Sequence, residues 1–358
     1  MLAHKLKMRK SSARMEVFMK QLELNNRKVA VIGCGFVGAT SAFGLMQSGL
    51  FSEMVLIDAN TEKAEGEAMD ISHGIPFARP MKIYAGGYDD IMDAAIIVVT
   101  AGANQKPGET RLDLVQKNVG IFKSIIPEIA KRDYQGILLI VSNPVDILTY
   151  TAHKLSGMPE NRVIGSGTVL DTARLKYELG EHLGVDSRSV HAFIIGEHGD
   201  SEIAAWSSAN VSGIPLNTFC EMRGHFNHDD SMERIAANVR NSAYEIIQRK
   251  QATYYGIAMA VKRICECIIR NEQSILPVSS MMHGIYGMED VVISMPAIVG
   301  KDGVEAVVPI ELDEEEQEQL KKSATLNLLI IAFKVFFDKD DNYCNHYNIK
   351  NQGSHNNQ

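Results

Sequence analysis

The sequence predicts an α/β protein in which a doubly wound parallel sheet is followed by a mixed α+β domain. Short apolar runs rich in β-branched residues alternate with helical patterns over residues 28–142, as expected for parallel strands buried on both faces. From about residue 165 the pattern changes to longer helices and mixed strands. A length of 358 residues fits two domains of about 100–200 residues each.

The first half contains four clear strand patterns. Residues 28–32 form the first and run directly into a glycine-rich segment and a helical pattern; the others are residues 54–57, 94–100 and 136–142. Apolar side chains then recur at three- and four-residue steps, which predicts an amphipathic helix over residues 111–132. The side chains of its apolar face are Leu112, Val115, Val119, Phe122, Ile126 and Ile129.

The second half predicts fewer strands and longer helices. Its expected helices are residues 168–183, 232–270 with a break near Tyr255-Gly256, and 313–322, and its expected strands are residues 188–195, 291–299 and 304–310. The boundary lies near residue 166. We therefore expect a basic N-terminal arm (1–27), a nucleotide-binding domain (28–166), a substrate domain (167–337) and a disordered polar tail (338–358).

Composition excludes several classes of protein. The net charge of −8 disfavours nucleic-acid binding. No stretch reaches the roughly 18–20 apolar residues that cross a bilayer, so we expect no membrane partner. Five cysteines in so long a chain are typical of reduced thiols in the cytoplasm. The first twenty residues are basic and lack the apolar centre of a secretory signal; their composition is compatible with an organelle transit peptide, but we favour an arm.

The glycine-rich segment Gly33-Cys34-Gly35-Phe36-Val37-Gly38 is the strongest single motif. It lies between a strand and a helix, where the first glycine permits the turn, the second lets a pyrophosphate approach and the third lets helix pack on strand. Twenty residues after Gly38, at a strand end, stands Asp58. A carboxylate there accepts hydrogen bonds from ribose hydroxyls and repels a 2′-phosphate, so the motif predicts a Rossmann domain that binds NAD.

His198 is the strongest candidate for proton transfer. A nicotinamide enzyme that reduces a ketone must protonate the oxygen, and histidine suits that role. His198 lies in Gly196-Glu197-His198-Gly199-Asp200, a turn after an apolar run. The turn alone does not distinguish it from a surface histidine.

Five motifs in order resemble the L-lactate/malate dehydrogenase family over about residues 27–324. They are residues 33–38 with Asp58, residues 100–111, Ser142-Asn143-Pro144-Val145-Asp146, residues 167–174 and residues 196–200. The resemblance implies hydride transfer between NADH and a 2-keto acid, and usually a homotetramer or homodimer. It favours the homotetramer for this chain.

By matching motif, the resemblance assigns catalytic roles to individual residues. His198 would be the proton donor and acceptor, and Asp171 would orient its ring. Arg174, three residues after Asp171, would hold the substrate carboxylate through two hydrogen bonds. Arg111 would polarise the substrate carbonyl when its loop closes.

Further residues follow from the same resemblance. Asn143 would bind near the substrate oxygen or nicotinamide, and Thr253 would line the pocket. Gln105 would favour pyruvate and L-lactate over oxaloacetate and malate, because the malate branch carries arginine there. The expected cofactor-binding residues are Gly33, Gly35, Phe36, Val37, Gly38, Asp58, Thr100, Gly102 and Asn143.

Fructose 1,6-bisphosphate activates some bacterial members of the family at a basic subunit interface. His191 matches one such position, and Lys176 replaces a family arginine at another. Lysine binds phosphate without the two-bond fork, so the sequence leaves activation open. After Ala324 the chain departs from the family pattern, because residues 326–337 are nearly apolar all round instead of amphipathic.

Competing functions have weaker support. A malate dehydrogenase is the second choice. A NAD-dependent glycosidase on a related fold would need a metal, and the sequence offers no convincing ligand set. Cys265-x-Cys267 is interpreted as two packed core residues. The polar loop that contains His225, His228, Asp229 and Asp230 is interpreted as a solvated cluster. We therefore predict no metal. A catalytically silent NAD-binding module would not be expected to retain His198, Asp171, Arg174 and Arg111.

Overall fold

The computed structural model describes residues 24–103 and 111–334. Most of the predicted N-terminal arm, Gln105 and the predicted polar tail lie outside these residues, as does the side chain of Arg111.

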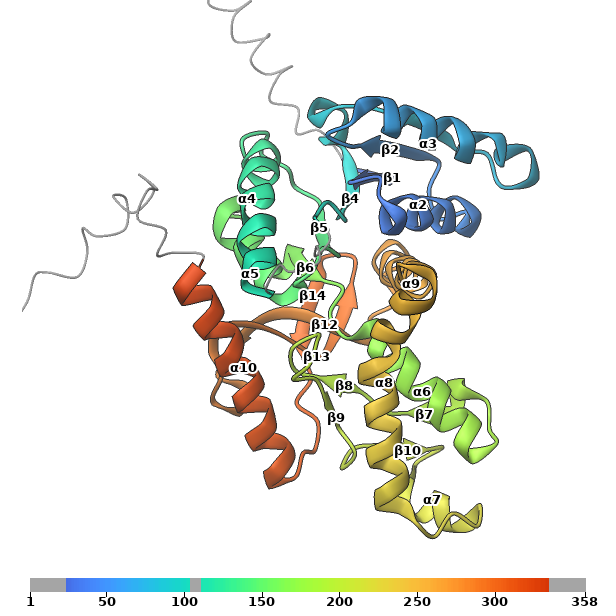
Figure 1. The fold of residues 1–358 in the computed structure, drawn as a ribbon. Coiled ribbons are helices and arrows are strands. Elements are labelled where there is room, and N and C mark those ends of the chain that lie inside the picture. Colours follow the sequence, from blue (N-terminus) through green and yellow to red (C-terminus); the bar gives the residue numbers. More distant parts are fainter. Residues whose placement is uncertain (1–23, 104–110, 335–358) are drawn as a thin grey trace, which may run out of the picture.

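The first half forms the predicted doubly wound sheet (Figure 1). Six parallel strands lie in the order β3-β2-β1-β4-β5-β6, the strand order of a Rossmann fold. Their bounds are β1 (Asn25–Ile32), β2 (Glu53–Ile57), β3 (Lys82–Ala85), β4 (Ala94–Val99), β5 (Ile137–Ile140) and β6 (Val163–Gly165). The order reverses between β1 and β4, which is where such folds bind their ligands.

Helices cover both faces of this sheet, which is why its strands are continuously apolar. Alternate residues of β1 face opposite ways: Val29 and Val31 pack with one set of helices, and Ala30 and Ile32 with another. The first set includes α2 (Phe36–Ser48), α3 (Thr61–His73) and α9 (Tyr255–Arg270), and the second α4 (Arg111–Ala130) and α5 (Val145–Ser156).

Two details of the first half differ from the sequence prediction. β1 begins at Asn25, so residues 25–27 belong to the sheet and not to the arm. Leu112, expected on the buried face of α4, is 45% exposed, whereas the other five apolar positions of that face are buried or nearly so. Leu112 lies in the first turn of α4, where the helix has not yet reached the sheet.

The second half contains the predicted helices as α6 (Val169–Leu183), α8 (His228–Lys250), α9 and α10 (Glu314–Lys334), and α8 begins four residues earlier than expected. A further short helix, α7 (Leu216–Met222), was not predicted. The long helical region breaks at residues 251–254 as expected, and Gln251 ends α8 in the left-handed conformation. α10 continues well past the predicted end at residue 322.

The predicted strand over residues 188–195 is wrong as one element. Its residues form β7 (Val190–His191) and β8 (Ile194–Ile195), which belong to different sheets. β7 pairs with β10 (Asn210–Val211), which also pairs with β11 (Ile214–Pro215), whereas β8 pairs with β9 (Ile203–Ala204). A continuous apolar run records burial, and burial alone does not reveal which sheet each residue joins.

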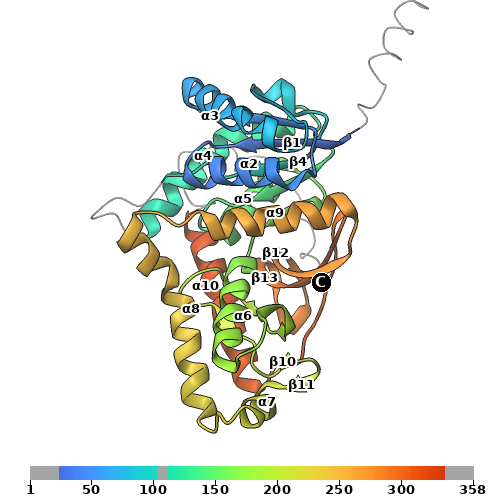
Figure 2. The same ribbon diagram turned by 90° about the vertical axis from the view of Figure 1, so that its right-hand side faces the viewer.

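The large sheet crosses the predicted domain boundary. Three antiparallel strands, β12 (Ser274–His283), β13 (Glu289–Gly300) and β14 (Gly303–Val307), extend it beyond β6 to nine strands within the described residues. β12 was not predicted, because its serines and Pro277 weaken the strand pattern. Figure 2 shows α9 lying along α2, so the second half also contributes a helix to the Rossmann face.

No helix within residues 24–103 and 111–334 is long and apolar enough to cross a membrane.

Asn327 is an unfavourable feature of the core. It lies in the unusually apolar part of α10 and is fully buried, and neither amide atom has a hydrogen-bond partner among the described residues. A buried polar group without a partner costs about 1–3 kcal/mol.

Replacing Asn327 by leucine should therefore stabilise the protein. We expect the free energy of unfolding to rise by about 1–3 kcal/mol, because the orphan amide is lost and a side chain of similar size takes its place. Urea unfolding followed by circular dichroism measures it. The matched variant Asn327→Asp should destabilise, because it buries a carboxylate; an unchanged or lower midpoint for Asn327→Leu would contradict the argument.

Candidate functional site

The glycine-rich loop forms the tight turn that the sequence predicted. Gly33 has a φ of +100°, and a Cβ there would lie 2.5 Å from the nitrogen of Ala101. A Cβ on Gly38 would lie 1.8 Å from the carbonyl oxygen of Gly33, whereas one on Gly35 would meet nothing within 4 Å. Gly33 and Gly38 are thus required by packing. Gly35 is the N-cap of α2, and its lack of a side chain leaves open space at the start of that helix.

The residues around this loop are held by short hydrogen bonds. Asp58, at the end of β2, accepts the N–H of Cys34 at 2.6 Å and that of Asn60 at 2.9 Å. The Thr100 hydroxyl donates to the Gly33 carbonyl at 2.7 Å. Because Asp58 contacts Cys34, it lies beside the open space at Gly35. Asp58 is only half-buried, so its carboxylate is accessible to a ribose.

Asn118 is a residue of this region that the sequence analysis missed. It is almost fully buried in α4, where its Oδ1 accepts the N–H of Ala103 at 2.8 Å and its Nδ2 donates to the Asn143 carbonyl at 2.7 Å. One side chain thus joins the loop after β4 to the turn after β5, with Gly102 and Asn143 left exposed. Sequence gave no signal, because Asn118 stands on the helix face that otherwise packs into the core.

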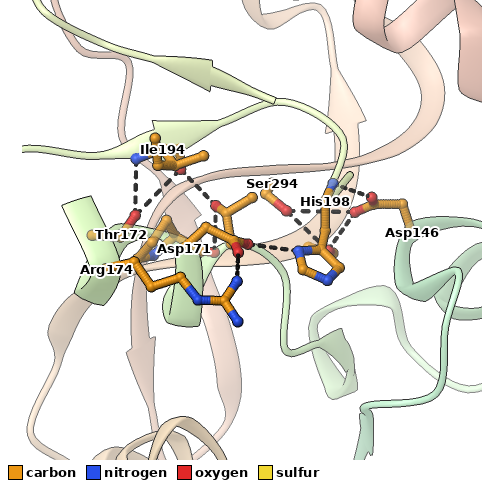
Figure 3. Close-up of polar contacts among 10 residues, drawn as sticks. Asp146, Asp171, Thr172, Arg174, Ile194, His198 and Ser294 are labelled. Atoms are coloured by element: carbon orange, nitrogen blue, oxygen red, sulfur yellow. Dashed lines mark hydrogen bonds and ion pairs between the residues drawn. The ribbon is translucent and has the colours of Figure 1, made fainter. Parts of the chain in front are cut away.

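The predicted catalytic trio is brought together at the start of α6. His198 Nδ1 lies 2.6 Å from Asp171 Oδ2, and Arg174 Nη1 donates to Asp171 Oδ1 at 2.8 Å (Figure 3). Asp171 is buried; it is not the helix N-cap, which is Thr168. The Nδ1–H of His198 therefore points at the carboxylate, which leaves Nε2 for a substrate.

Charge controls the protonation of this pair. Burial alone lowers the pKa of His198, but the charge of Asp171 and the hydrogen bond to it outweigh burial and raise the pKa to about 9. Burial likewise raises the pKa of Asp171, yet His198 and Arg174 bring it below its usual range. The resting site thus contains an imidazolium beside a carboxylate, ready to donate a proton.

The turn that carries His198 is anchored from three sides. The backbone N–H of His198 donates to Asp146 Oδ2 at 2.9 Å. The Glu197 N–H donates to the Ser323 hydroxyl of α10 at 2.9 Å, and Gly196 exchanges backbone hydrogen bonds with Ser294 of β13. Asp146, Ser294 and Ser323 were not among the predicted site residues, since they act from elements distant in sequence.

Thr253 lies in the break between α8 and α9, beside Tyr254. The Tyr254 ring stacks on that of Phe36 at 5.4 Å between centroids. This contact brings the predicted substrate-site loop against the glycine-rich loop. Val37 is half-buried, and Phe36 is largely exposed.

The two residues matched to a phosphate-activator site lie on neighbouring elements. Lys176 is half-buried in α6, and His191 is exposed on β7, which packs near α6. Burial lowers the pKa of Lys176.

Metal-binding candidates within the described residues reduce to one group. Cys265 and Cys267 are buried in the core between α9 and the sheet, so packing explains them. The ring centroids of His225 and His182 lie 4.1 Å apart, so His225 packs against another histidine ring. Asp171, His198 and Glu202 place one donor atom each within 4.8 Å of one another, but the Asp171–His198 hydrogen bond already accounts for two of them.

Two family models match the chain in succession. The lactate/malate dehydrogenase NAD binding domain matches residues 27–165, and the lactate/malate dehydrogenase alpha/beta C-terminal domain matches residues 168–331. The chain belongs to the lactate/malate dehydrogenase family. It therefore contains the family's NAD-binding domain, and the open space at Gly35 with Asp58 beside it fits that cofactor.

Curated members of the family are similar over most of their length. An L-lactate dehydrogenase of Acetivibrio thermocellus is 56% identical over 310 residues, covering 86% of this chain and 98% of its own. An L-lactate dehydrogenase of Thermoanaerobacterium saccharolyticum is 55% identical, covering 84% and 96%.

Two solved structures are also similar to this chain over most of their length. The minor L-lactate dehydrogenase of Enterococcus mundtii in its ligands-bound form has a TM-score of 0.83 and 44% identity, covering 86% of this chain and 98% of that one. A lactate dehydrogenase from a Medee basin deep-sea metagenome library has a TM-score of 0.84 and 48% identity, covering 87% and 99%.

The raised pKa of His198 predicts opposite pH profiles for the two directions of reaction. Reduction needs the imidazolium, so its kcat/KM should be level below about pH 8 and fall about tenfold per pH unit above pH 9. Oxidation needs the neutral ring and should rise up to about pH 9. Stopped-flow kinetics with saturating cofactor measures both. The exposed-histidine variant His73→Asn should leave both profiles unchanged; a midpoint near 6.5, the ordinary pKa of histidine, would contradict the assignment.

Proposed function

We propose that this chain is an NAD-dependent L-lactate dehydrogenase that interconverts pyruvate and L-lactate. The observation that carries the proposal is the hydrogen bond between His198 Nδ1 and buried Asp171, with Arg174 on the other carboxylate oxygen. The relatives named as L-lactate dehydrogenases support lactate over malate as the product.

The proposed mechanism assigns one task to each residue. When bound, NADH supplies the hydride, and Gly33, Gly35, Phe36, Val37, Gly38, Asp58, Thr100, Gly102 and Asn143 would hold the cofactor. Arg174 binds the pyruvate carboxylate; it makes no hydrogen bond other than that to Asp171 among the described residues. His198 donates the Nε2 proton to the keto oxygen and keeps its Nδ1 proton, which stays hydrogen-bonded to the Asp171 carboxylate throughout. In the reverse direction, neutral His198 accepts the hydroxyl proton of lactate.

Other residues complete the proposed pocket. Arg111 polarises the substrate carbonyl and Thr253 lines the pocket. Gln105 would leave no cation for a second substrate carboxylate, which favours pyruvate. These three assignments rest on the family resemblance of the residue sequence.

The remaining proposals concern organisation and regulation. The nucleotide-binding and substrate units divide near residue 166, which is supported by the two family models. We propose a cytoplasmic homotetramer: exposed Phe43, Tyr255 and Met259 on α2 and α9 are apolar surface that a second copy would cover. Lys176 and His191 are the proposed ligands of fructose 1,6-bisphosphate.

Replacing His198 tests the function directly. His198→Asn should lower the turnover of pyruvate by about 10²–10⁴-fold, the usual contribution of a general acid, while NADH still binds. The readouts are NADH absorbance for turnover and NADH fluorescence for binding. Near-normal turnover would remove His198 from the mechanism.

Gln105→Arg tests the choice of keto acid. Oxaloacetate has a second carboxylate where pyruvate has a methyl group, and an unpaired charge in a closed site costs several kcal/mol. The wild type should therefore prefer pyruvate by about 10³-fold in kcat/KM, and the variant should reverse that preference by supplying a guanidinium partner. The ratio of kcat/KM for the two acids measures it. Wild-type preference for oxaloacetate would refute the lactate assignment, and an unmoved ratio in the variant would show that Gln105 does not face the substrate.

A further inference from the structure

A second buried carboxylate lies on the other side of His198 from Asp171. It belongs to Asp146, in the first turn of α5, and only 2% of Asp146 is exposed. Figure 3 shows His198 between Asp171 and Asp146. Asp171 is hydrogen-bonded to the ring of His198, whereas Asp146 accepts the backbone N–H of His198.

Both oxygens of Asp146 are engaged by the protein itself. Oδ2 accepts the peptide N–H of His198 at 2.9 Å. Oδ1 accepts the hydroxyl of Ser279 in β12, and the hydroxyl of Ser294 in β13 lies 3.4 Å away. Since the carboxylate is enclosed by these donors, it acts on a substrate only through His198.

The position of Asp146 joins the two halves of the site. It comes three residues after Asn143, so one turn presents Asn143 outward at the cofactor edge and Asp146 inward at the His198 turn. Its hydroxyl partners come from β12 and β13, the strands that the second half adds to the sheet. A single side chain thus fixes the His198 backbone relative to the nucleotide-binding strands.

Hydrogen bonding alone does not explain a carboxylate here. An amide oxygen would accept the same N–H without the cost of burying a charge. A negative charge has a further effect that an amide lacks, because it stabilises the imidazolium of His198.

We propose that Asp146 is a positioning residue for His198, which fixes the backbone of the histidine turn and, by its charge, favours the protonated ring. The inference rests on the proposed function, in which His198 is the general acid and base.

The surrounding charges allow this role. Burial raises the pKa of Asp146 to about 6, while the Ser279 hydroxyl and the His198 N–H limit the rise. Asp146 is therefore ionised over the range in which His198 titrates, and its charge adds to that of Asp171 in raising the pKa of His198. Glu197 in the same turn opposes ionisation of Asp146.

Glu202 must be separated from this effect. Burial and the charge of Asp171 raise its pKa to about 8, opposed by His198, Arg240 and Arg174. It thus ionises within the same pH range, and its charge also acts on His198.

The test is Asp146→Asn in the full-length protein, with pH profiles of kcat/KM in both directions. We expect the midpoint of each pH profile to move down by about one pH unit, because a negative charge near the ring of His198 is lost. Pyruvate reduction at pH 9 should then be about fivefold slower, with the Kd for NADH unchanged. If activity falls equally at every pH and the midpoints stay, Asp146 is merely structural and the proposal is overturned.

Two serine variants provide a test that does not depend on the folding of Asp146→Asn. Ser279→Ala removes a hydrogen-bond donor but keeps the carboxylate, which stays ionised near pH 9 because its pKa is about 6, so the midpoints should stay close to those of the wild type. The neighbouring Ser280 is also buried, and its hydroxyl has no partner within the described residues. Ser280→Ala is the matched control and should leave the midpoints unchanged. A fall of about one pH unit in the midpoints of Ser279→Ala would show that packing around Asp146, and not its charge, sets the protonation of His198, and would overturn the proposal.

Glu202→Gln completes the design. The shift caused by Asp146→Asn should persist in the Glu202→Gln background; its disappearance would assign the effect to Glu202 and overturn the proposal. Failure of the proposed function has a different signature, because the wild type would then lack the oppositely directed pH profiles.

Discussion

The contact between His198 and Asp171 is the interaction on which the rest of the site depends. A buried carboxylate is costly unless it is paired, and Asp171 is paired on one oxygen by His198 and on the other by Arg174. The same contact fixes the ring tautomer and outweighs the burial that would otherwise lower the pKa of His198. One pairing therefore supplies orientation and proton affinity together.

The fold supports this pairing by bringing distant segments to one edge. The glycine-rich loop, Thr100, Asn143 and the start of α6 all follow the carboxyl ends of parallel strands β1, β4, β5 and β6, where α/β proteins bind ligands. The His198 turn comes from outside this sheet. It is brought to the edge by hydrogen bonds to α5, β13 and α10, so the second half of the chain completes a site that the first half only begins.

Local patterns in the sequence were sufficient for much of the Rossmann half. Strand β1, the glycine turn and Asp58 are contiguous or nearly so, and their geometry follows from steric limits on the turn and from continuous burial. The pairing of His198, Asp171 and Arg174 came from the family resemblance and not from periodicity, because a histidine in a turn is otherwise indistinguishable from a surface residue. Asn118 was missed, and Asp146 was named only as part of a motif without a role, since a polar residue on a buried helix face has no signature without its partner.

The sequence by itself determined the fold class, the dinucleotide turn and its preference for NAD, because these depend on residues close together in the chain and on backbone sterics. Only the tertiary structure decided that the sheet continues through β12, β13 and β14, that the run over residues 188–195 splits between two sheets, and which side chains anchor His198. Each of these depends on hydrogen bonds between segments far apart in sequence. Such a bond is specified by two positions at once, and a local pattern contains only one of them.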